Sequence, residues 1–136
     1  MQFNIQPLKH TDYEEFLCDW WKDWRWTPPQ KNFLPENGTG GYMIYVDDTP
    51  VVAGFLYNTN SDVAWVDFII SNFNYKHKEN RLIAIDMLLK SLEQRAVAIN
   101  KKFLYALTKH KNLIASYEAN GYIGAGVYNV ELIKKL

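Results

Sequence analysis

Hydrophobic and polar positions recur with clear periods along most of the chain. Residues 3–8 begin as a short alternating segment that a proline interrupts, which predicts a first strand. Apolar residues then recur every three or four positions from Tyr13 to Trp24, as on one face of an amphipathic helix. Pro28 and Pro29 cannot continue a helix, so this one is expected to end before them.

The predicted first helix begins with the spacing of a capping box. In that motif two side chains each satisfy a backbone donor of the first turn, and here the two residues are Thr11 and Glu14. Proline, asparagine and glycine are frequent in residues 27–40, which predicts an irregular segment on the surface.

Three strand patterns follow, at residues 41–46, 50–58 and 63–71, and short polar turns between them favour an antiparallel meander. From Asn80, the expected N-cap, the period changes to that of a helix of about five turns. The remaining patterns predict a strand at 101–108, a short helix at 111–120 and a last strand at 126–133.

The resulting order, β-α-β-β-β-α-β-α-β, predicts a mixed α/β fold. A helix between the fourth and fifth strands predicts that these two are parallel and joined by a right-handed crossover, whereas the other pairs are antiparallel. The length of 136 residues suits one domain, residues 1–136, with helices on both faces of a mainly antiparallel sheet.

The composition narrows the class of protein. Apolar residues make up 48% of the chain, enough for a packed core, yet no apolar run has the length of a membrane span. The beginning of the chain lacks the pattern of a signal peptide. Cys18 is the single cysteine, and the three histidines are scattered without metal-ligand spacing. We therefore expect a cytoplasmic protein with no disulfide, no metal site and no membrane segment.

The net charge is zero, but it is unevenly distributed. Residues 1–70 hold four Lys and Arg against ten Asp and Glu, and residues 71–136 hold eleven against five. A neutral chain does not favour nucleic acid, although residues 75–81 combine aromatic and basic side chains. This asymmetry favours the binding of an anionic ligand by the C-terminal half and of a cationic ligand by the N-terminal half. The alternative is that this distribution has no functional meaning.

A motif near the end of the chain carries a family resemblance. Tyr117, Glu118, Gly121 and Tyr122 form the pattern Tyr-Glu-x-x-Gly-aromatic after the last predicted helix. With the order of elements and the opening IQPLKHTDYEEF, this resembles the GCN5-related N-acetyltransferase superfamily, whose motif ends in phenylalanine. The chain also looks like the compact, divergent members encoded by bacteriophages, which would place it in a host cytoplasm.

The resemblance implies an activity. Members of the superfamily move an acetyl group from acetyl-coenzyme A to an amine. The acceptor here would be a small molecule, or a lysine or N-terminus of a protein, and the enzyme would be a monomer or homodimer.

The resemblance also implies a pyrophosphate loop leading into the long helix, with the pattern Arg/Gln-x-x-Gly-x-Gly/Ala. Glycines in such a loop let consecutive N–H groups approach an anion. The corresponding residues here are Glu79, Asn80, Arg81, Leu82, Ile83 and Ala84, and only the last fits. A helix N-terminus still favours an anion by about 0.3–1 kcal/mol. Positive side chains nearby can help to hold a phosphate; these are Lys76, His77, Lys78 and Arg81. The alternative is a solvated basic loop.

Two residues are candidates for the chemistry. Asp67 lies in the apolar pattern 63–71, where a carboxylate is costly unless it is hydrogen-bonded or in use, and it is the candidate general base. The alternative is an acid that faces solvent or pairs with a cation. Tyr117 matches the tyrosine that protonates the departing thiolate in similar proteins, although it can instead only pack against the cofactor.

Further cofactor contacts follow from the resemblance alone. It assigns the backbone N–H groups of Ile69, Ile70 and Ser71 to the thioester carbonyl and the pantetheine arm. It also makes His110 and Asn112 candidates for contact with the cofactor.

The tryptophans of the sequence WWKDWRW divide into two groups. Trp20 and Trp24 fit the apolar face of the first helix, whereas Trp21 and Trp26 fit it less well. The latter two are candidates for an aromatic wall of the acceptor site, which suits a cationic amine. The alternative function is a non-catalytic module that binds a protein partner through exposed aromatic side chains.

Overall fold

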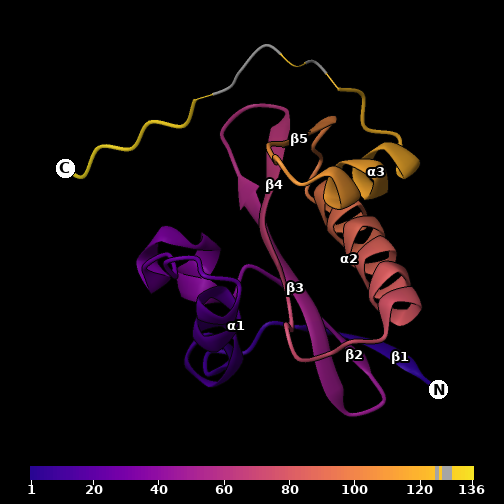
Figure 1. The fold of residues 1–136 in the computed structure, drawn as a ribbon. Coiled ribbons are helices and arrows are strands. Elements are labelled where there is room, and N and C mark those ends of the chain that lie inside the picture. Colours follow the sequence, from indigo (N-terminus) through magenta and orange to yellow (C-terminus); the bar gives the residue numbers. More distant parts are fainter. Residues whose placement is uncertain (125, 127–129) are drawn as a thin grey trace.

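A computed structural model describes residues 1–124, 126 and 130–136, and all structural statements concern these residues. Five strands form one sheet in the order β1-β2-β3-β4-β5 (Figure 1). The elements are β1 (Phe3–Pro7), a π-helical turn (Tyr13–Leu17) that continues into α1 (Cys18–Asp23), two 3₁₀ turns (Lys31–Phe33 and Pro35–Gly38), β2 (Gly41–Val46), β3 (Thr49–Asn58), β4 (Val63–Ser71), α2 (Lys78–Ala98), β5 (Phe103–Ala106) and α3 (Lys111–Ala119). The predicted mixed α/β fold is confirmed.

The sheet is antiparallel except at one edge. β1 to β4 form the predicted antiparallel meander, and α2 connects β4 to a parallel β5. The parallel pairing covers only Val63–Val66 of β4 against Phe103–Ala106 of β5. β4 continues to Ser71 without this partner, so the two strands separate halfway along β4.

Each face of the sheet carries its own hydrophobic core, because neighbouring side chains of a strand point to opposite faces. The core on the α1 side includes Leu17, Trp20, Trp21, Met43, Ala53, Phe55 and Ile70. The core on the α2 side includes Ile44, Val52, Leu56, Val66, Leu88, Leu89 and Leu92. Helices therefore cover both faces, as predicted.

A bulge interrupts β4 where it leaves β5. Ala53 pairs with Ile70 and Phe55 with Asp67, so Gly54 alone lies opposite two residues, Phe68 and Ile69. A Cβ atom on Gly54 would lie 2.4 Å from Ile69 Cδ1 and 3.0 Å from Leu88 Cδ2. The glycine thus lets α2 pack closely against the sheet beside the bulge.

The first helix differs from its prediction in its first turn. Asp12, 2% exposed, precedes this turn, and its carboxylate accepts a hydrogen bond from the Lys9 N–H at 2.8 Å. Glu14 pairs with Lys31 Nζ at 2.7 Å instead of reaching back to the backbone. The predicted capping box of Thr11 and Glu14 is therefore wrong, because Lys31 from a later turn takes the glutamate.

Two later segments also differ in part. Residues 27–40 contain the two 3₁₀ turns, and Leu34 is 3% exposed, so this segment is anchored in the core instead of lying only on the surface. The predicted last strand at 126–133 includes residues 127–129, which lie outside the described residues. The described positions Gly126 and 130–133 are not in a strand.

Candidate functional site

The separation of β4 and β5 defines the candidate site. Beyond Val66, the residues of β4 have no strand partner on the β5 side among the described residues. Segments that precede α2 and α3 follow the ends of these two strands. The open half of β4, Asp67–Ser71, therefore has an unpaired edge among the described residues, and its end leads into the segment before α2 (Figure 1).

Asp67 is the first residue of this open half. Its side chain is half-buried, and its carboxylate accepts a hydrogen bond from the Phe68 N–H at 2.7 Å. Burial raises the pKa of the Asp67 carboxyl, the hydrogen bond opposes this change, and the charge of Glu131 adds to it. A carboxylate with a raised pKa is better matched to accept a proton near neutral pH.

Phe68 adopts a backbone conformation that is unusual for a bulky residue. Its φ is +54°, a value that costs about 1–2 kcal/mol for a residue with a side chain. The ring packs edge-on against Trp21 and Phe33, at centroid distances of 6.4 and 5.8 Å. These contacts hold the bulge, and backbone strain of this kind is common at functional sites.

The other open residues of β4 divide between the two faces. Ile69 packs with the core on the α2 side, whereas Ile70 is 2% exposed in the core on the α1 side. The carbonyl oxygen of Ser71 accepts a hydrogen bond from Trp24 Nε1 at 2.9 Å. Trp24, which was predicted to belong to the core, is half-buried and attaches the end of α1 to the end of β4.

Tyr117 of α3 approaches the same region. Its side chain is 5% exposed, and its ring lies edge-on to Tyr122, with centroids 4.8 Å apart. Burial raises the pKa of the Tyr117 hydroxyl, and the nearby Tyr122 and Asp67 raise it further. The two predicted catalytic residues are thus close enough to interact electrostatically, and the tyrosine remains protonated, as a proton donor must.

The N-terminus of α2 is capped differently from the prediction. His77 is the N-cap, and its Nδ1 accepts a hydrogen bond from the Asn80 N–H at 3.3 Å. Asn80 is 5% exposed, and its side chain donates to the Tyr75 hydroxyl at 2.9 Å. The prediction of Asn80 as the N-cap is wrong, because the helix begins three residues earlier than that cap would place it and the Asn80 side chain instead fixes the preceding loop.

Arg81 also holds this loop. Its guanidinium donates to the Tyr75 carbonyl oxygen, while its Nε is buried and has no hydrogen-bond partner among the described residues. Lys76 Nζ lies 4.0 Å from the centroid of the Phe73 ring, and Lys78 is exposed. Three positive side chains therefore lie near the start of α2, and one of them keeps a buried N–H without an acceptor in the part of the chain that the structure describes.

The remaining positions of the predicted pyrophosphate loop differ in exposure. Ala84 is 0% exposed against the sheet, which suits a small residue. Leu82 and Ile83 are 43% and 51% exposed, and Glu79 also lies on the surface. Leu82, which stands at the glycine position of the pattern, and its neighbour Ile83 are thus not needed for the core.

The acceptor-site candidates lie in different environments. Trp21 is 2% exposed in the core, so it does not form an exposed wall. The π-helical turn before α1 explains this, because one extra residue in a turn rotates the following residues about the helix axis. Trp26 is 39% exposed and stacks at 5.0 Å on His110, the residue that precedes α3, whereas Asn112 is exposed on α3 itself.

Some residues of the site had no signal in the sequence. Tyr75 accepts hydrogen bonds from Asn80 and Arg81 that fix the loop before α2, and Phe68 shapes the bulge. Neither belongs to a motif, and their roles depend on contacts between segments that are distant in the sequence. Trp26 and His110, selected for different reasons, are brought into contact.

Among the described residues, no helix combines the length and apolar character that a membrane crossing requires. Within the same residues, no group of three or more histidine, cysteine, aspartate or glutamate side chains is arranged to hold a metal ion.

Comparison with protein-family models gives no match, and comparison with curated protein sequences gives none either. Solved structures do match. Glucosamine-6-phosphate N-acetyltransferase from Arabidopsis thaliana superposes with a TM-score of 0.68 at 9% identity, over 98% of this chain and 100% of that chain. AAC(6')-Iy, in complex with the bisubstrate analogue CoA-S-monomethyl-acetylneamine, superposes with a TM-score of 0.65 at 12% identity, over 100% and 99%.

A protein-modifying enzyme has a similar structure. The ribosomal-protein-S18-alanine N-acetyltransferase from Escherichia coli superposes with a TM-score of 0.61 at 18% identity, over 88% of this chain and 77% of that chain. Identities this low establish similarity of fold and not of substrate. The chain therefore has the fold of the GCN5-related N-acetyltransferases.

Proposed function

We propose that this protein is an N-acetyltransferase that moves an acetyl group from acetyl-coenzyme A to an amine. The observation that carries the proposal is the pair Asp67 and Tyr117 beside the open half of β4. Burial raises the pKa of both side chains, and the charge of Asp67 contributes to the raised pKa of Tyr117. A base and a proton donor close enough for the charge of one to affect the pKa of the other are what acyl transfer to an amine needs.

The residues at the start of α2 fit the pyrophosphate of acetyl-coenzyme A, which supplies the activated acetyl group. The buried Nε of Arg81 has no partner among the described residues, and Lys76 and Lys78 lie on the same loop and first turn. The helix N-terminus adds a favourable dipole. In this proposal side chains hold the anion, in place of the glycine-rich backbone of similar proteins. Asn80 contributes by fixing the loop through Tyr75.

The chemistry assigns one proton to each catalytic residue. Asp67, directly or through water, accepts the proton that the acceptor amine loses. The amine nitrogen forms a bond to the acetyl carbon as the carbon–sulfur bond breaks. Tyr117 donates its hydroxyl proton to the departing thiolate. The backbone N–H groups of Ile69 and Ser71 are the proposed donors to the thioester carbonyl and the pantetheine arm. The Ile70 N–H, expected from the resemblance to take part, points instead toward β3, as does the Asn72 N–H that donates to the Val51 carbonyl oxygen.

The acceptor is an amine of a small molecule or of a protein. Trp26 is the proposed aromatic contact for a cationic amine, since its ring is exposed near the start of α3. His110, whose ring contacts Trp26, and Asn112 are proposed cofactor contacts. The acidic N-terminal half of the chain would favour the approach of a cation.

Calorimetric titration with acetyl-coenzyme A, and separately with coenzyme A, tests the proposal. We expect micromolar binding, and the double substitution Lys76→Ala and Lys78→Ala should weaken it at least about tenfold, because a charge-assisted hydrogen bond contributes about 1.5–3 kcal/mol. The matched control is Lys9→Ala with Lys22→Ala, which removes two exposed charges from the N-terminal half.

One observation favours a second function. The His77 side chain already occupies an N–H group at the start of α2, and Leu82 stands where similar proteins have glycine. A domain that had lost its cofactor could keep this fold and bind a protein partner. Absence of binding at millimolar acetyl-coenzyme A would favour this non-catalytic function and contradict the enzyme proposal.

A further inference from the structure

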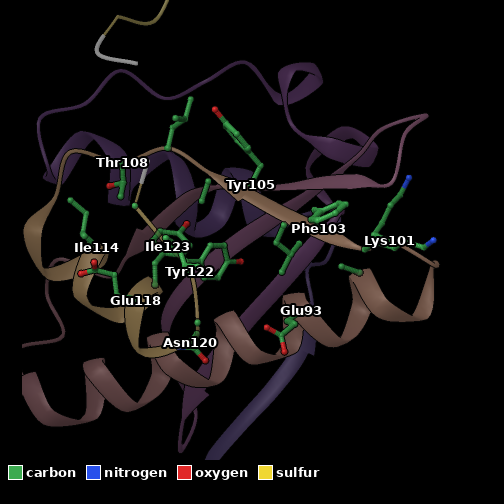
Figure 2. A pocket seen from close by; sticks show the side chains of 18 of the residues that line it. Glu93, Lys101, Phe103, Tyr105, Thr108, Ile114, Glu118, Asn120, Tyr122 and Ile123 are labelled. Atoms are coloured by element: carbon green, nitrogen blue, oxygen red, sulfur yellow. The ribbon is translucent and has the colours of Figure 1, made fainter. Parts of the chain in front are cut away.

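Two cavities lie on different sides of the C-terminal half of α2. The first, of about 790 Å³, lies between α2, β5 and α3, and its wall includes Gly124 and Gly126 (Figure 2). These glycines flank position 125, which is outside the described residues. The second cavity, of about 570 Å³, is lined by residues between Pro7 and Ile99, so its whole lining belongs to the part of the chain that the structure describes.

The second cavity has a mostly apolar lining, contributed by the sheet, α2 and the second 3₁₀ turn. Leu56 of β3 is 8% exposed and Leu92 of α2 is 0% exposed, and both belong to the core on the α2 side. Pro7, Tyr42 and Ile99 extend this lining. Sites for small molecules are concave, mostly apolar and about 300–1,000 Å³ in volume. The second cavity has the size and the lining of such a site.

Two charged side chains line this cavity, one of each sign. They are Arg95 of α2 and Glu36 of the second 3₁₀ turn, and both residues are exposed. Neither takes part in an ion pair with another described residue. Glu93, which Figure 2 shows at the first cavity, lies two residues from Arg95 and therefore on a different side of the helix. The cavity thus offers one cation and one anion, each without a charged partner among the described residues.

The turn that carries Glu36 is strained and is held by hydrogen bonds. Glu36 and Asn37 have φ values of 49° and 54°, in the left-handed region that is unfavourable for residues with a side chain. Thr39 Oγ1 donates to the Glu36 carbonyl oxygen at 2.8 Å. The Gly40 N–H donates to the Pro35 carbonyl oxygen at 3.0 Å. Backbone strain that the surrounding structure holds in place is common at ligand sites, and here it fixes the backbone of Glu36 beside the cavity.

We propose that this cavity binds a zwitterion with an apolar body, which is an apolar amino acid or a short apolar peptide with free ends. The Arg95 guanidinium binds the carboxylate of the ligand, because its planar N–H groups match the two carboxylate oxygens. The Glu36 carboxylate accepts hydrogen bonds from the ammonium group of the ligand. The apolar part of the ligand packs on Leu56 and Leu92. A ligand with a single charge would leave one of the two charged side chains without a partner.

This cavity is separate from the proposed catalytic residues. Arg95 follows Arg81 by fourteen residues, which is about 21 Å along the axis of α2. Asn58 of β3, which also lines the cavity, pairs with Ala64 in the half of β4 that pairs with β5. The proposed binding therefore does not depend on the proposed acetyl transfer.

Calorimetric titration of the whole chain with leucine, and separately with leucyl-leucine, tests the proposal. We expect a Kd below about 1 mM for at least one of the two, and the tighter ligand shows whether the site takes an amino acid or a peptide. The amide of that ligand lacks the carboxylate, and its N-acetyl derivative lacks the ammonium group. Each derivative should bind at least about tenfold more weakly, because a charge-assisted hydrogen bond is lost.

Substitutions locate the site. Arg95→Gln and Glu36→Gln should each weaken binding at least about tenfold, and circular dichroism should show that both variants remain folded, since both positions are exposed. In Arg95→Gln the ligand and its amide should bind with equal affinity, because the side chain that distinguishes them is gone. The matched control is Arg25→Gln, an exposed arginine outside the cavity, which should bind the ligand as the wild-type chain does.

Three results would overturn the proposal. The first is absence of binding of both leucine and leucyl-leucine at about 10 mM. The second is an equal loss of affinity in Arg95→Gln and in the control Arg25→Gln. The third is binding that survives Arg95→Gln and Glu36→Gln but is lost in Trp26→Ala. The ligand would then occupy the proposed acceptor site, so this result would support the proposed function while contradicting the second site.

Discussion

The two halves of β4 share one strand but differ in what they contribute. In Val63–Val66, which pair with β5, Ala64 and Val66 are 0% exposed, and the Trp65 and Tyr105 rings lie 4.4 Å apart. In Asp67–Ser71 there is instead a half-buried carboxylate, a bulge and a positive φ. The paired half is built for stability and the open half has features that cost stability. Substitutions in the paired half should therefore lower the free energy of unfolding and leave kcat unchanged. Substitutions at the open half should lower kcat and leave the free energy of unfolding unchanged or raise it.

The largest expected effect is on activity, at a residue that faces the open half. Tyr117→Phe removes the proposed proton donor and keeps the buried ring, so kcat for acetyl transfer should fall about 10²–10⁴-fold with little change in Tm. Steady-state kinetics with a reactive amine and a thermal melt measure the two quantities. The matched control is Tyr105→Phe in the paired half, which should leave kcat unchanged. Equal loss in both variants would show that the hydroxyl of Tyr117 has no special role.

Asp67→Asn should separate activity from stability. Loss of the proposed base should lower kcat about 10²-fold, at the lower end of the range for general bases, because water can partly replace it. The asparagine can still accept the hydrogen bond from the Phe68 N–H. In the wild-type chain, kcat should fall as the pH drops below the raised pKa of Asp67, and this dependence should disappear in the variant.

Asp67→Asn should lower kcat but raise the stability of the fold. The pKa of Asp67 is raised in the folded state, so its protonated form is favoured there. Its contribution to stability is present at low pH and is lost as the pH rises through that pKa. Asp67→Asn should therefore raise the free energy of unfolding at neutral pH, as measured by urea titration. Asp62→Asn in the exposed turn before β4 is the control and should have no such effect.

The smallest effect is expected in the paired half. Trp65→Leu removes the ring contact with Tyr105, which contributes about 0.5–1.5 kcal/mol to the free energy of unfolding, while kcat should remain unchanged. Urea titration and steady-state kinetics provide the comparison. A fall in kcat comparable to that of Asp67→Asn would show that the paired half also takes part in the chemistry.

The order of elements from β1 to α3 was predictable, because it depends on local periodicity and on general rules of chain connection. The strands at 41–46 and 63–71 have simple patterns, and a helix between two strands favours a parallel pair. Asp67 was also detectable, since a charged residue in an apolar strand is conspicuous. The fold and one part of the candidate site thus followed from patterns within single segments.

The remaining features depend on contacts between segments. The π-helical turn that brings Trp21 into the core has no recognised local pattern. The choice of His77 over Asn80 as the N-cap of α2 follows from the hydrogen bond between Asn80 and Tyr75. Phe68 is held at positive φ by rings from α1 and the first 3₁₀ turn. Only the three-dimensional packing reveals these features.

The short parallel pairing of β4 and β5 has a consequence for how the chain folds. Val63 and Phe103 are partners in the sheet, although they are about forty residues apart, whereas the strands of the meander are joined by short turns. Closing the longer connection costs more entropy and requires α2 to form first. We expect β5 and α3 to join the sheet last, so that a folding intermediate would contain Asp67 but not a correctly placed Tyr117.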